Sequence, residues 1–390
     1  MTGVLVFLLG IHVVGAISLG SLLPSSAQSI DRQYLTPPPT THDTKTAWWW
    51  MHAVADENVG GKPAVNIQLV FYQGLVFPPP AGYPRFHVDV SGVWPNGTYF
   101  TYTAPATSTT VTTLGNEVTG TWEGAGSFIS SPGMSYKVTL LNDVFQGTVL
   151  LESAGPEHYS CDDTTSALFS GLVPEGEMSA EEDLLFNHLG WAVSVPGGRA
   201  TVSLVIQGHP LVFTGTGYHD QNHIDTNYYF SEFVSDWYYG QATVGPYVFS
   251  YLKAKAFNSN RTVTTGFLAR NGVVLQNQCS TSLSLPTTSN ISSVDTAQAA
   301  NTMHLTPVGV YHSNTSDVDV PLGYTVDYLL SNGEKYSFTL MEVGESVDLS
   351  FYHRSLGVVT GGKVGEAPWQ ATTFFEWLNP GFNVYDPVVG

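Results

Sequence analysis

The chain has 390 residues, of which 43% are hydrophobic, and this is enough apolar material for the cores of two domains. Lysine and arginine number 13 against 32 aspartate and glutamate residues, so the formal net charge is -19 at pH 7. A surface this acidic repels phosphate backbones and anionic lipids, so we expect neither nucleic acid nor a peripheral membrane surface as a partner.

An apolar stretch lies close to the amino end. Residues 4–23 are apolar apart from His12 and small residues, and a small-residue cleavage site ends at Ala27. The pattern predicts a secretory signal peptide over residues 1–27. The stretch lacks basic residues before it and is long, so an uncleaved anchor is the alternative. We therefore expect a protein of the secretory pathway, either secreted or held in a vesicular or endomembrane lumen.

Two further features agree with secretion. N-glycosylation sequons in polar, turn-like contexts begin at Asn96, Asn260, Asn290 and Asn314. The two cysteines, Cys161 and Cys279, form one disulfide in an oxidising compartment or remain separate thiols. We expect the disulfide, worth about 4 to 5 kcal/mol in the chain-entropy description. Neither cysteine has a histidine or cysteine neighbour at metal-ligand spacing, so no metal is expected there.

Short strands dominate the chain after a polar, Pro-rich lead-in over residues 28–46, which we expect to be extended and poorly packed. Alternating or apolar segments, typical of half-buried strands, recur at intervals near ten residues. They are 64–72, 85–94, 98–103, 111–114, 117–122, 135–141, 145–152, 200–213, 247–256, 262–270, 273–276, 324–330, 335–342 and 347–354. Only residues 178–187, capped by Ser179, and 295–302 favour short helices. The chain is predicted to be all-β, with antiparallel sheets closing into barrels or sandwiches.

Polar and titratable side chains crowd together between Gly215 and His223. As a strand, this segment sends Tyr218, Asp220 and Asn222 to one face and His219, Gln221 and His223 to the other. As a turn, it would use Gly215 and Gly217 for their backbone freedom. A functional pocket and a structural hydrogen-bonded cluster both explain it. The segment also divides the chain into two predicted β-lobes, residues 28–222 and 223–390.

The element Gly-x-Gly-Tyr-His-Asp ending at Asp220 resembles the signature of a family of two-lobed, lipocalin-like β-proteins. That family includes the carotenoid hydratases and fungal cyclases that perform Diels-Alder reactions. There the motif is commonly followed by Asn-Trp; here Asn222 matches, but His223 replaces the tryptophan. The tandem Trp48 to Trp50, the run from Phe186 to Trp191 and the pair Glu376-Trp377 support the resemblance over most of the mature chain.

This resemblance implies two lipocalin-like antiparallel barrel or sandwich lobes and a pericyclase of fungal secondary metabolism. With a signal peptide and sequons, the chain is similar to the branch that forms meroterpenoids by intermolecular hetero-Diels-Alder reaction. There a tropolone ortho-quinone methide, formed by dehydration, adds to a humulene-type sesquiterpene. Such chemistry implies no cofactor, because two apolar partners, a polyketide-derived dienone and a terpene, need only be held in one reactive geometry. His219 and Asp220 would assist the loss of water as an acid-base pair, with His223 as a further titratable group.

A pocket between the lobes would supply the remaining groups. Tyr218 or Asn222 would donate a hydrogen bond to a developing oxyanion. Aromatic candidates for its wall are Trp49, Trp50, Trp191, Trp237 and Trp377. No nucleophile elbow, zinc-protease motif, Walker loop or dinucleotide fingerprint occurs, and His219, Asp220 and His223 lack a further ligand for a metal. The alternatives are an intramolecular Diels-Alderase acting on a polyketide, an isoprenoid hydratase and a non-catalytic lipocalin-like carrier.

Overall fold

The computed structural model describes residues 29–35, 39, 43–56, 64–131, 135–174, 176–283 and 302–379. The predicted signal peptide and the sequon at Asn290 lie outside these residues, as does the helix expected over 295–302 except for Thr302, which begins a strand. No helix in the described ranges is long and apolar enough to span a membrane.

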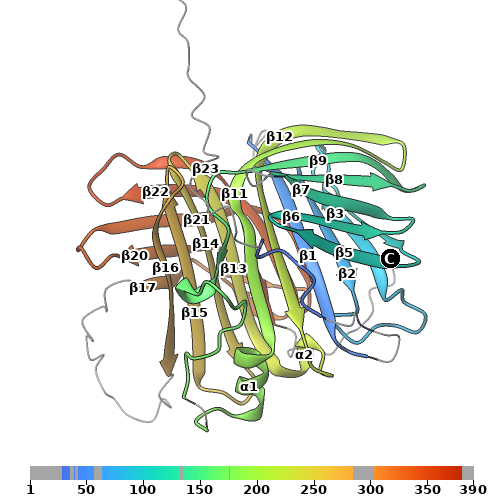
Figure 1. Ribbon diagram of the computed structural model, residues 1–390. Helices are drawn as coiled ribbons and strands as arrows, with labels where there is room; N and C mark the ends of the chain where they lie inside the picture. Colours follow the sequence, from blue (N-terminus) through green and yellow to red (C-terminus); the bar gives the residue numbers. More distant parts are fainter. Residues whose placement is uncertain are drawn as a thin grey trace, which may run out of the picture.

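Two large antiparallel sheets make up almost all of the described chain, which confirms the all-β prediction (Figure 1). The first sheet contains β1 (Thr46–Ala55), β2 (Asn66–Gln73), β3 (Phe86–Val93), β4 (Tyr99–Pro105), β5 (Thr109–Leu114), β6 (Glu117–Trp122), β7 (Gly126–Ser131), β8 (Ser135–Leu141), β9 (Phe145–Ser153), β10 (His158–Tyr159), β11 (Leu189–Ile206) and β12 (His209–Ile224). Its order is β4-β3-β2-β1-β12-β11-β9-β8-β7-β6-β5, with β10 also paired to β11.

The second sheet contains β13 (Val234–Val244), β14 (Tyr247–Ala256), β15 (Arg261–Arg270), β16 (Val273–Leu283), β17 (Thr302–Val308), β20 (Gly323–Leu329), β21 (Lys335–Leu349), β22 (Tyr352–Lys363) and β23 (Trp369–Leu378). Its order is β16-β15-β14-β13-β23-β22-β21-β20-β17. A separate hairpin joins β18 (Tyr311–Ser313) to β19 (Val318–Val320). Helix is limited to η1 (Ser160–Asp162), α1 (Ala180–Asn187) and α2 (Phe230–Phe233) in the described ranges. The first sheet ends at Ile224 and the second begins at Val234, with α2 between them.

The Gly215 to His223 segment is a strand at the centre of the first sheet. It forms the end of β12, which pairs with β1 on one side and β11 on the other. β11 and β12 are joined by a tight hairpin at Gln207 and Gly208, which both have positive φ, as the twist-compatible hairpin turn requires. The strand interpretation of the motif is therefore confirmed, and successive side chains alternate between two different interiors.

Those two interiors hold separate hydrophobic clusters. Trp49, with Phe71, Trp122 and Phe128, belongs to a core enclosed by the first sheet. Trp50, one residue on, belongs to a second core between the two sheets. The tandem tryptophans of β1 thus divide between the two cores because neighbours on a strand point in opposite directions.

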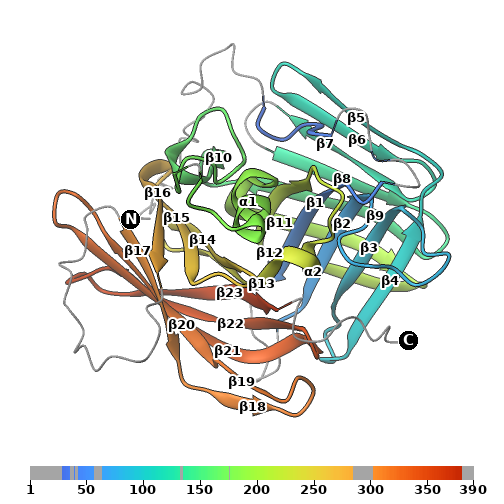
Figure 2. The same cartoon turned by 90° about the horizontal axis from the view of Figure 1, so that it is seen from below.

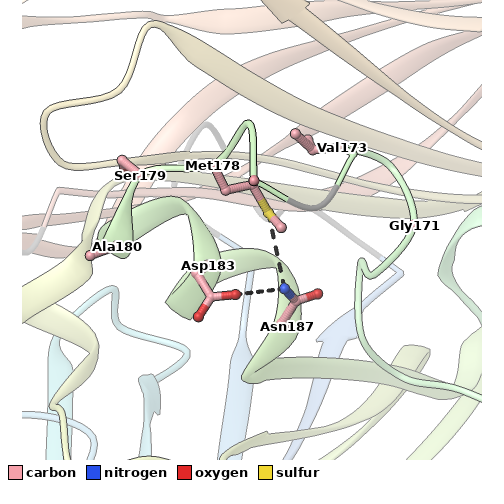
Figure 3. Close-up of a pocket in the computed structure, with 8 residues that line it drawn as sticks. Gly171, Val173, Met178, Ser179, Ala180, Asp183 and Asn187 are labelled. Atoms are coloured by element: carbon pink, nitrogen blue, oxygen red, sulfur yellow. Dashed lines mark hydrogen bonds between the residues drawn. The ribbon is translucent and has the colours of Figure 1, made fainter.

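Helix α1 begins where its sequence predicts. Ser179 accepts a hydrogen bond from the Glu182 amide, and the Glu182 carboxylate accepts one from the Ser179 amide, forming a capping box. Both α1 and α2 lie between the two sheets at one end of the molecule (Figures 1 and 2). A surface depression of about 490 Å³ beside α1 includes Met178 and Asp183, and Asn187 donates to Asp183 within it (Figure 3). None of its lining residues is aromatic, and none belongs to β12.

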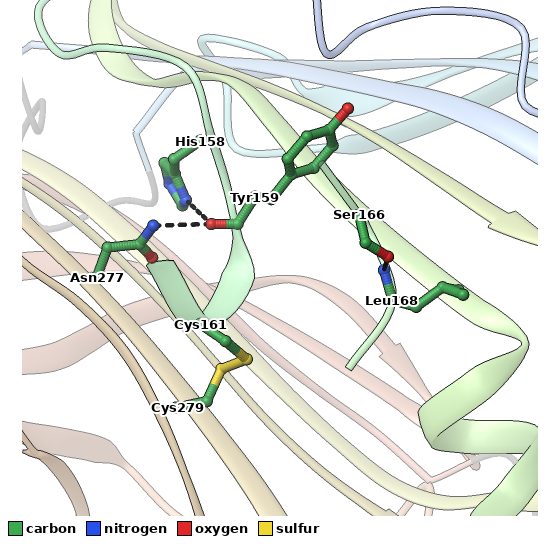
Figure 4. The surroundings of a disulfide bond; sticks show 7 residues. All are labelled: His158, Tyr159, Cys161, Ser166, Leu168, Asn277 and Cys279. Atoms are coloured by element: carbon green, nitrogen blue, oxygen red, sulfur yellow. Dashed lines mark hydrogen bonds between the residues drawn. A yellow bond between two sulfur atoms is a disulfide. The ribbon is translucent and has the colours of Figure 1, made fainter. Parts of the chain in front are cut away.

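The disulfide between Cys161 and Cys279 is present, as predicted (Figure 4). Cys161 lies in η1, next to the first sheet, and Cys279 lies in β16 of the second sheet. Beside the disulfide, the Asn277 side-chain amide donates to the Tyr159 carbonyl over 2.8 Å. His158 stacks on Phe267 with ring centroids 3.9 Å apart. These contacts fasten the two sheets together at one side of the interface that holds the second core.

Candidate active site

A cavity of about 140 Å³ lies between the two sheets. Strands β1, β2 and β12 supply one wall and strands β13, β22 and β23 supply the other. Most of the lining is apolar or aromatic, namely Trp48, Trp50, Val70, Tyr72, Val76, Phe77, Phe230, Trp237, Tyr239 and Leu378. Its few charged or amide groups are Asp220, Asn222, Arg354 and Glu376, with the Tyr352 hydroxyl beside them. An apolar pocket with a few convergent polar groups at the interface between lobes is the usual form of a small-molecule site.

Asp220 is the polar centre of the first wall. Its Oδ2 accepts hydrogen bonds from Trp191 Nε1 over 2.9 Å and from the Tyr218 hydroxyl over 3.0 Å. Its Oδ1 accepts from Asn222 Nδ2 over 2.8 Å. Burial raises the pKa of Asp220 to about 7, because the hydrogen bond from Trp191, the charge of His219 and the hydrogen bond from Tyr218 offset only part of the desolvation cost. Near neutral pH this carboxyl group therefore exists partly as the neutral acid.

The hydrogen bonds also decide where the acidic proton resides. Oδ2 accepts from two donors at once, so the proton of the neutral acid is carried by Oδ1. This is the oxygen shared with Asn222, the other polar residue of the same wall. The Oδ1 atom of Asn222 is buried and has no partner in the described part of the chain. The first wall thus offers a carboxylic acid and an unpaired acceptor next to each other.

A second polar group faces the first from the other sheet. Arg354 of β22 and Glu376 of β23 are direct partners in the strand register. The Tyr352 hydroxyl donates to Glu376, and Arg354 Nε donates to the Tyr352 oxygen over 2.8 Å while lying 3.8 Å from Glu376 Oε2. Burial raises the pKa of Glu376, and the charge of Arg354 counteracts this in part. Glu376 in turn contributes to the raised pKa of Asp220, after burial itself, so the two carboxyl groups sense each other across the cavity.

The three residues predicted to be catalytic do not come together. His219 lies on the opposite face of β12 from Asp220, in the core of the first sheet. Its Nε2 contacts Asp31 over 2.8 Å and its Nδ1 contacts the Trp50 carbonyl over 3.0 Å. His223 does not line the cavity either, and stacks on Tyr34 at 4.4 Å. Burial lowers the pKa of His223 to about 4, so this imidazole is neutral at physiological pH.

The expectation of a poorly packed lead-in is wrong for residues 29–35. Asp31 is fully buried, and its Oδ1 accepts a hydrogen bond from Trp49 Nε1 over 2.7 Å. Together with His219, this closes a network inside the first sheet. The polar composition of the segment concealed this role, because one buried aspartate gives no periodic signal.

The predicted binding residues fall into three groups. Trp50, Asn222 and Trp237 line the cavity. Tyr218 and Trp191 lie behind Asp220 and hold its Oδ2. Trp49 and Trp377 lie elsewhere: Trp49 is in the first core, and Trp377 stacks on Tyr238 with centroids 5.7 Å apart.

Among the lining residues that carry a hydroxyl or a charged group, Tyr72, Tyr239, Tyr352, Arg354 and Glu376 were not predicted. The available signal was a charged residue inside a short apolar run, as Glu376 is between Phe374 and Leu378 in β23. The sequons at Asn96, Asn260 and Asn314 are on exposed residues outside the strands, and their glycosylation stays a prediction.

Residues 78–376 match the Diels-Alderase-like family, so the chain belongs to that family. Two fungal relatives are each described as a quinolone epoxide rearrangement protein. The relative penF from Penicillium thymicola is 26% identical over 81% of this chain and 80% of its own length. The relative asqO from Emericella nidulans is 32% identical over 54% of each chain. The crystal structure of CghA with Sch210972 shares the fold, with a TM-score of 0.62 and 17% identity over 87% of this chain and 89% of that chain.

The family assignment, with these two relatives, indicates an enzyme of secondary metabolism that catalyses a pericyclic or rearrangement reaction.

Proposed function

We propose that Asp220 acts as a general acid, protonating an oxygen leaving group of a substrate held in the aromatic cavity, and that ring closure comes next. The observation that carries this proposal is a buried carboxyl group with a pKa of about 7 on the cavity wall. General acids work best when their pKa lies near the operating pH. The donors Trp191 and Tyr218 leave Oδ1 as the oxygen that transfers its proton.

The reaction implied by the resemblance uses this acid in its first step. Asp220 transfers its proton to the hydroxyl of a hydroxymethyl tropolone, the C–O bond breaks, and water leaves. The ring hydroxyl returns a proton to the Asp220 carboxylate, so the products are water and the neutral ortho-quinone methide. This then adds to a double bond of a humulene-type sesquiterpene, forming one C–C and one C–O bond with no further proton transfer.

A one-substrate rearrangement is the second candidate. Asp220 would protonate an epoxide oxygen, the weaker C–O bond would break, and an internal oxygen nucleophile would close the ring and return its proton. Two observations favour this form. The cavity, at about 140 Å³, is smaller than most ligand pockets, and both relatives are named for epoxide rearrangement. The faces of Trp48, Trp50 and Trp237 would stabilise positive charge at the opening carbon.

Product analysis distinguishes the candidates. The purified protein is incubated with a hydroxymethyl tropolone plus humulene, and separately with a quinolone that carries an epoxide on its side chain. Products are separated by chiral chromatography and compared with the uncatalysed reaction. Acceleration and a single stereoisomer from one mixture identify the reaction. Recovery of intact ligand from both, at the uncatalysed rate, would refute the proposal and favour a carrier.

A further inference from the structure

Burying the charged side chains of Arg354 and Glu376 on the second sheet costs solvation free energy. The Arg354 side chain is 9% exposed and that of Glu376 is 13% exposed, so both charges are largely withdrawn from solvent. A buried ion pair seldom gains enough from its mutual attraction to offset the loss of hydration. An apolar pair in the same register positions would pack this sheet equally well, so the group calls for a role beyond holding β22 against β23.

The hydrogen bonds of the group leave two atoms available. Tyr352 and Arg354 Nε both engage Glu376 through Oε2, and Arg354 Nη1 donates to Ser91 over 3.3 Å. Within the described ranges, neither Glu376 Oε1 nor Arg354 Nη2 has a hydrogen-bond partner. One is an acceptor and the other a donor, and both belong to residues that line the cavity.

We propose that Arg354 and Glu376 form a subsite for a planar ring function that presents one acceptor and one donor side by side. A cyclic lactam fits this description, with its carbonyl facing Arg354 and its N–H facing Glu376. The hydroxy-ketone edge of a tropolone has the same pattern of one carbonyl and one adjacent O–H. The inference rests on the proposed function, because it positions the ring of the same substrate whose leaving oxygen meets Asp220.

The two walls then divide the work. The second sheet holds the ring, and the first sheet delivers the proton from Asp220. Arginine suits the first task because its rigid, always charged fork keeps a fixed direction, whereas a lysine would not. Fixing the ring in one orientation confines the leaving oxygen to one place and removes much of the entropic part of the barrier. Arg354 and Glu376 are positioning residues in this scheme and take no part in proton transfer.

Binding of matched probes tests the subsite without any turnover. Quenching of tryptophan fluorescence reports occupancy, because Trp48, Trp50 and Trp237 line the cavity. Quinolin-2-one is compared with its N-methyl derivative, and with an isomer that carries the methyl group on carbon and keeps its N–H. Tropolone is compared with its methyl ether. We expect the probes that keep the donor to bind at least tenfold more tightly than the blocked ones. Equal binding of each pair by the wild-type protein would overturn the inference.

Variants locate the effect. Replacing both partners, R354M with E376Q, avoids leaving a lone buried charge, and it should abolish the tenfold discrimination while the N-methyl probe binds as before. The matched control is R270M with E366Q, which removes an exposed ion pair of 3.5 Å and should keep the discrimination. Discrimination that persists in the R354M/E376Q protein would also overturn the inference. The D220N protein should discriminate normally, so a failure of the acid role and a failure of this subsite are separable.

Discussion

On each side of β12 a buried aspartate accepts a hydrogen bond from a tryptophan indole, but the surroundings of the two aspartates differ. On one face Asp220 accepts a hydrogen bond from the Trp191 indole over 2.9 Å, and on the other Asp31 accepts one from the Trp49 indole over 2.7 Å. The second oxygen of Asp31 is taken by His219, deep in the core of the first sheet. The second oxygen of Asp220 is shared only with Asn222, on the wall of the cavity, among the described residues.

This comparison separates a structural cluster from a reactive one. Inside the first sheet both oxygens of the aspartate have protein partners, and its contacts lie in a packed core, so the network serves stability. Between the sheets the acid keeps one oxygen within reach of a ligand, beside an Asn222 acceptor that is unpaired in the described ranges. Buried polar groups left incomplete by the protein are the ones that a substrate can complete.

The largest expected effect comes from removing the acid on the cavity face. D220N keeps an acceptor for Trp191 and Tyr218 but cannot transfer a proton, and general acid catalysis contributes about 10² to 10⁴ in rate. We therefore expect kcat to fall by about that factor while the thermal unfolding temperature changes little. Single-turnover product formation measures the first and calorimetry the second. The matched variant on the other face is D31A, which removes the acceptor of the Trp49 indole and should show the reverse pattern. A D220N enzyme with normal turnover would remove Asp220 from the mechanism.

Loss of the disulfide should destabilise the interface between the two sheets, which forms the cavity, more than the core around Asp31. The cavity needs both sheets, whereas the core around Asp31 belongs to the first sheet alone. The pairing of Cys161 with Cys279 spans 118 residues, and such a loop contributes about 5 kcal/mol in the chain-entropy description. The double variant C161A/C279A should therefore lose about that much free energy of unfolding in denaturant titrations. It should also bind cavity probes more weakly than the wild type. Unchanged stability in the double variant would show that packing alone joins the sheets.

Removing the Asp31 carboxylate from the core of the first sheet should lower stability and leave catalysis unchanged. D31A leaves the Trp49 indole N–H and His219 Nε2 without partners, and each unsatisfied buried group costs about 1 to 3 kcal/mol. We expect a loss of about 2 to 6 kcal/mol in the free energy of unfolding, measured by urea titration, with kcat unchanged in the folded fraction. Loss of turnover in fully folded D31A protein would contradict the separation of the two faces.

The polar part of the first wall can be predicted from the sequence because Asp220 and Asn222 lie on one strand. Period-two alternation places Asp220 and Asn222 on one face of β12, and it separates Trp49 from Trp50 on β1. The pairing of His219 with Asp220 fails for the same reason, since neighbours in a strand cannot meet. Arg354 and Glu376 reach the cavity through the packing of one sheet on another, and Asp31 reaches His219 from 188 residues away. Such distant contacts leave no local pattern to interpret.

The pH dependence provides the finest test of the comparison. Asp220 must be protonated to act, and its pKa lies near 7, so kcat/KM should be constant at lower pH and fall about tenfold per pH unit above about pH 7. The Tyr218 hydrogen bond favours the carboxylate and lowers this pKa, so Y218F should move the falling limb to higher pH. The R270M/E366Q profile should keep the wild-type midpoint, because this exposed ion pair lies outside the cavity lining. A midpoint that stays at its wild-type value in Y218F would show that the titrating group is not Asp220.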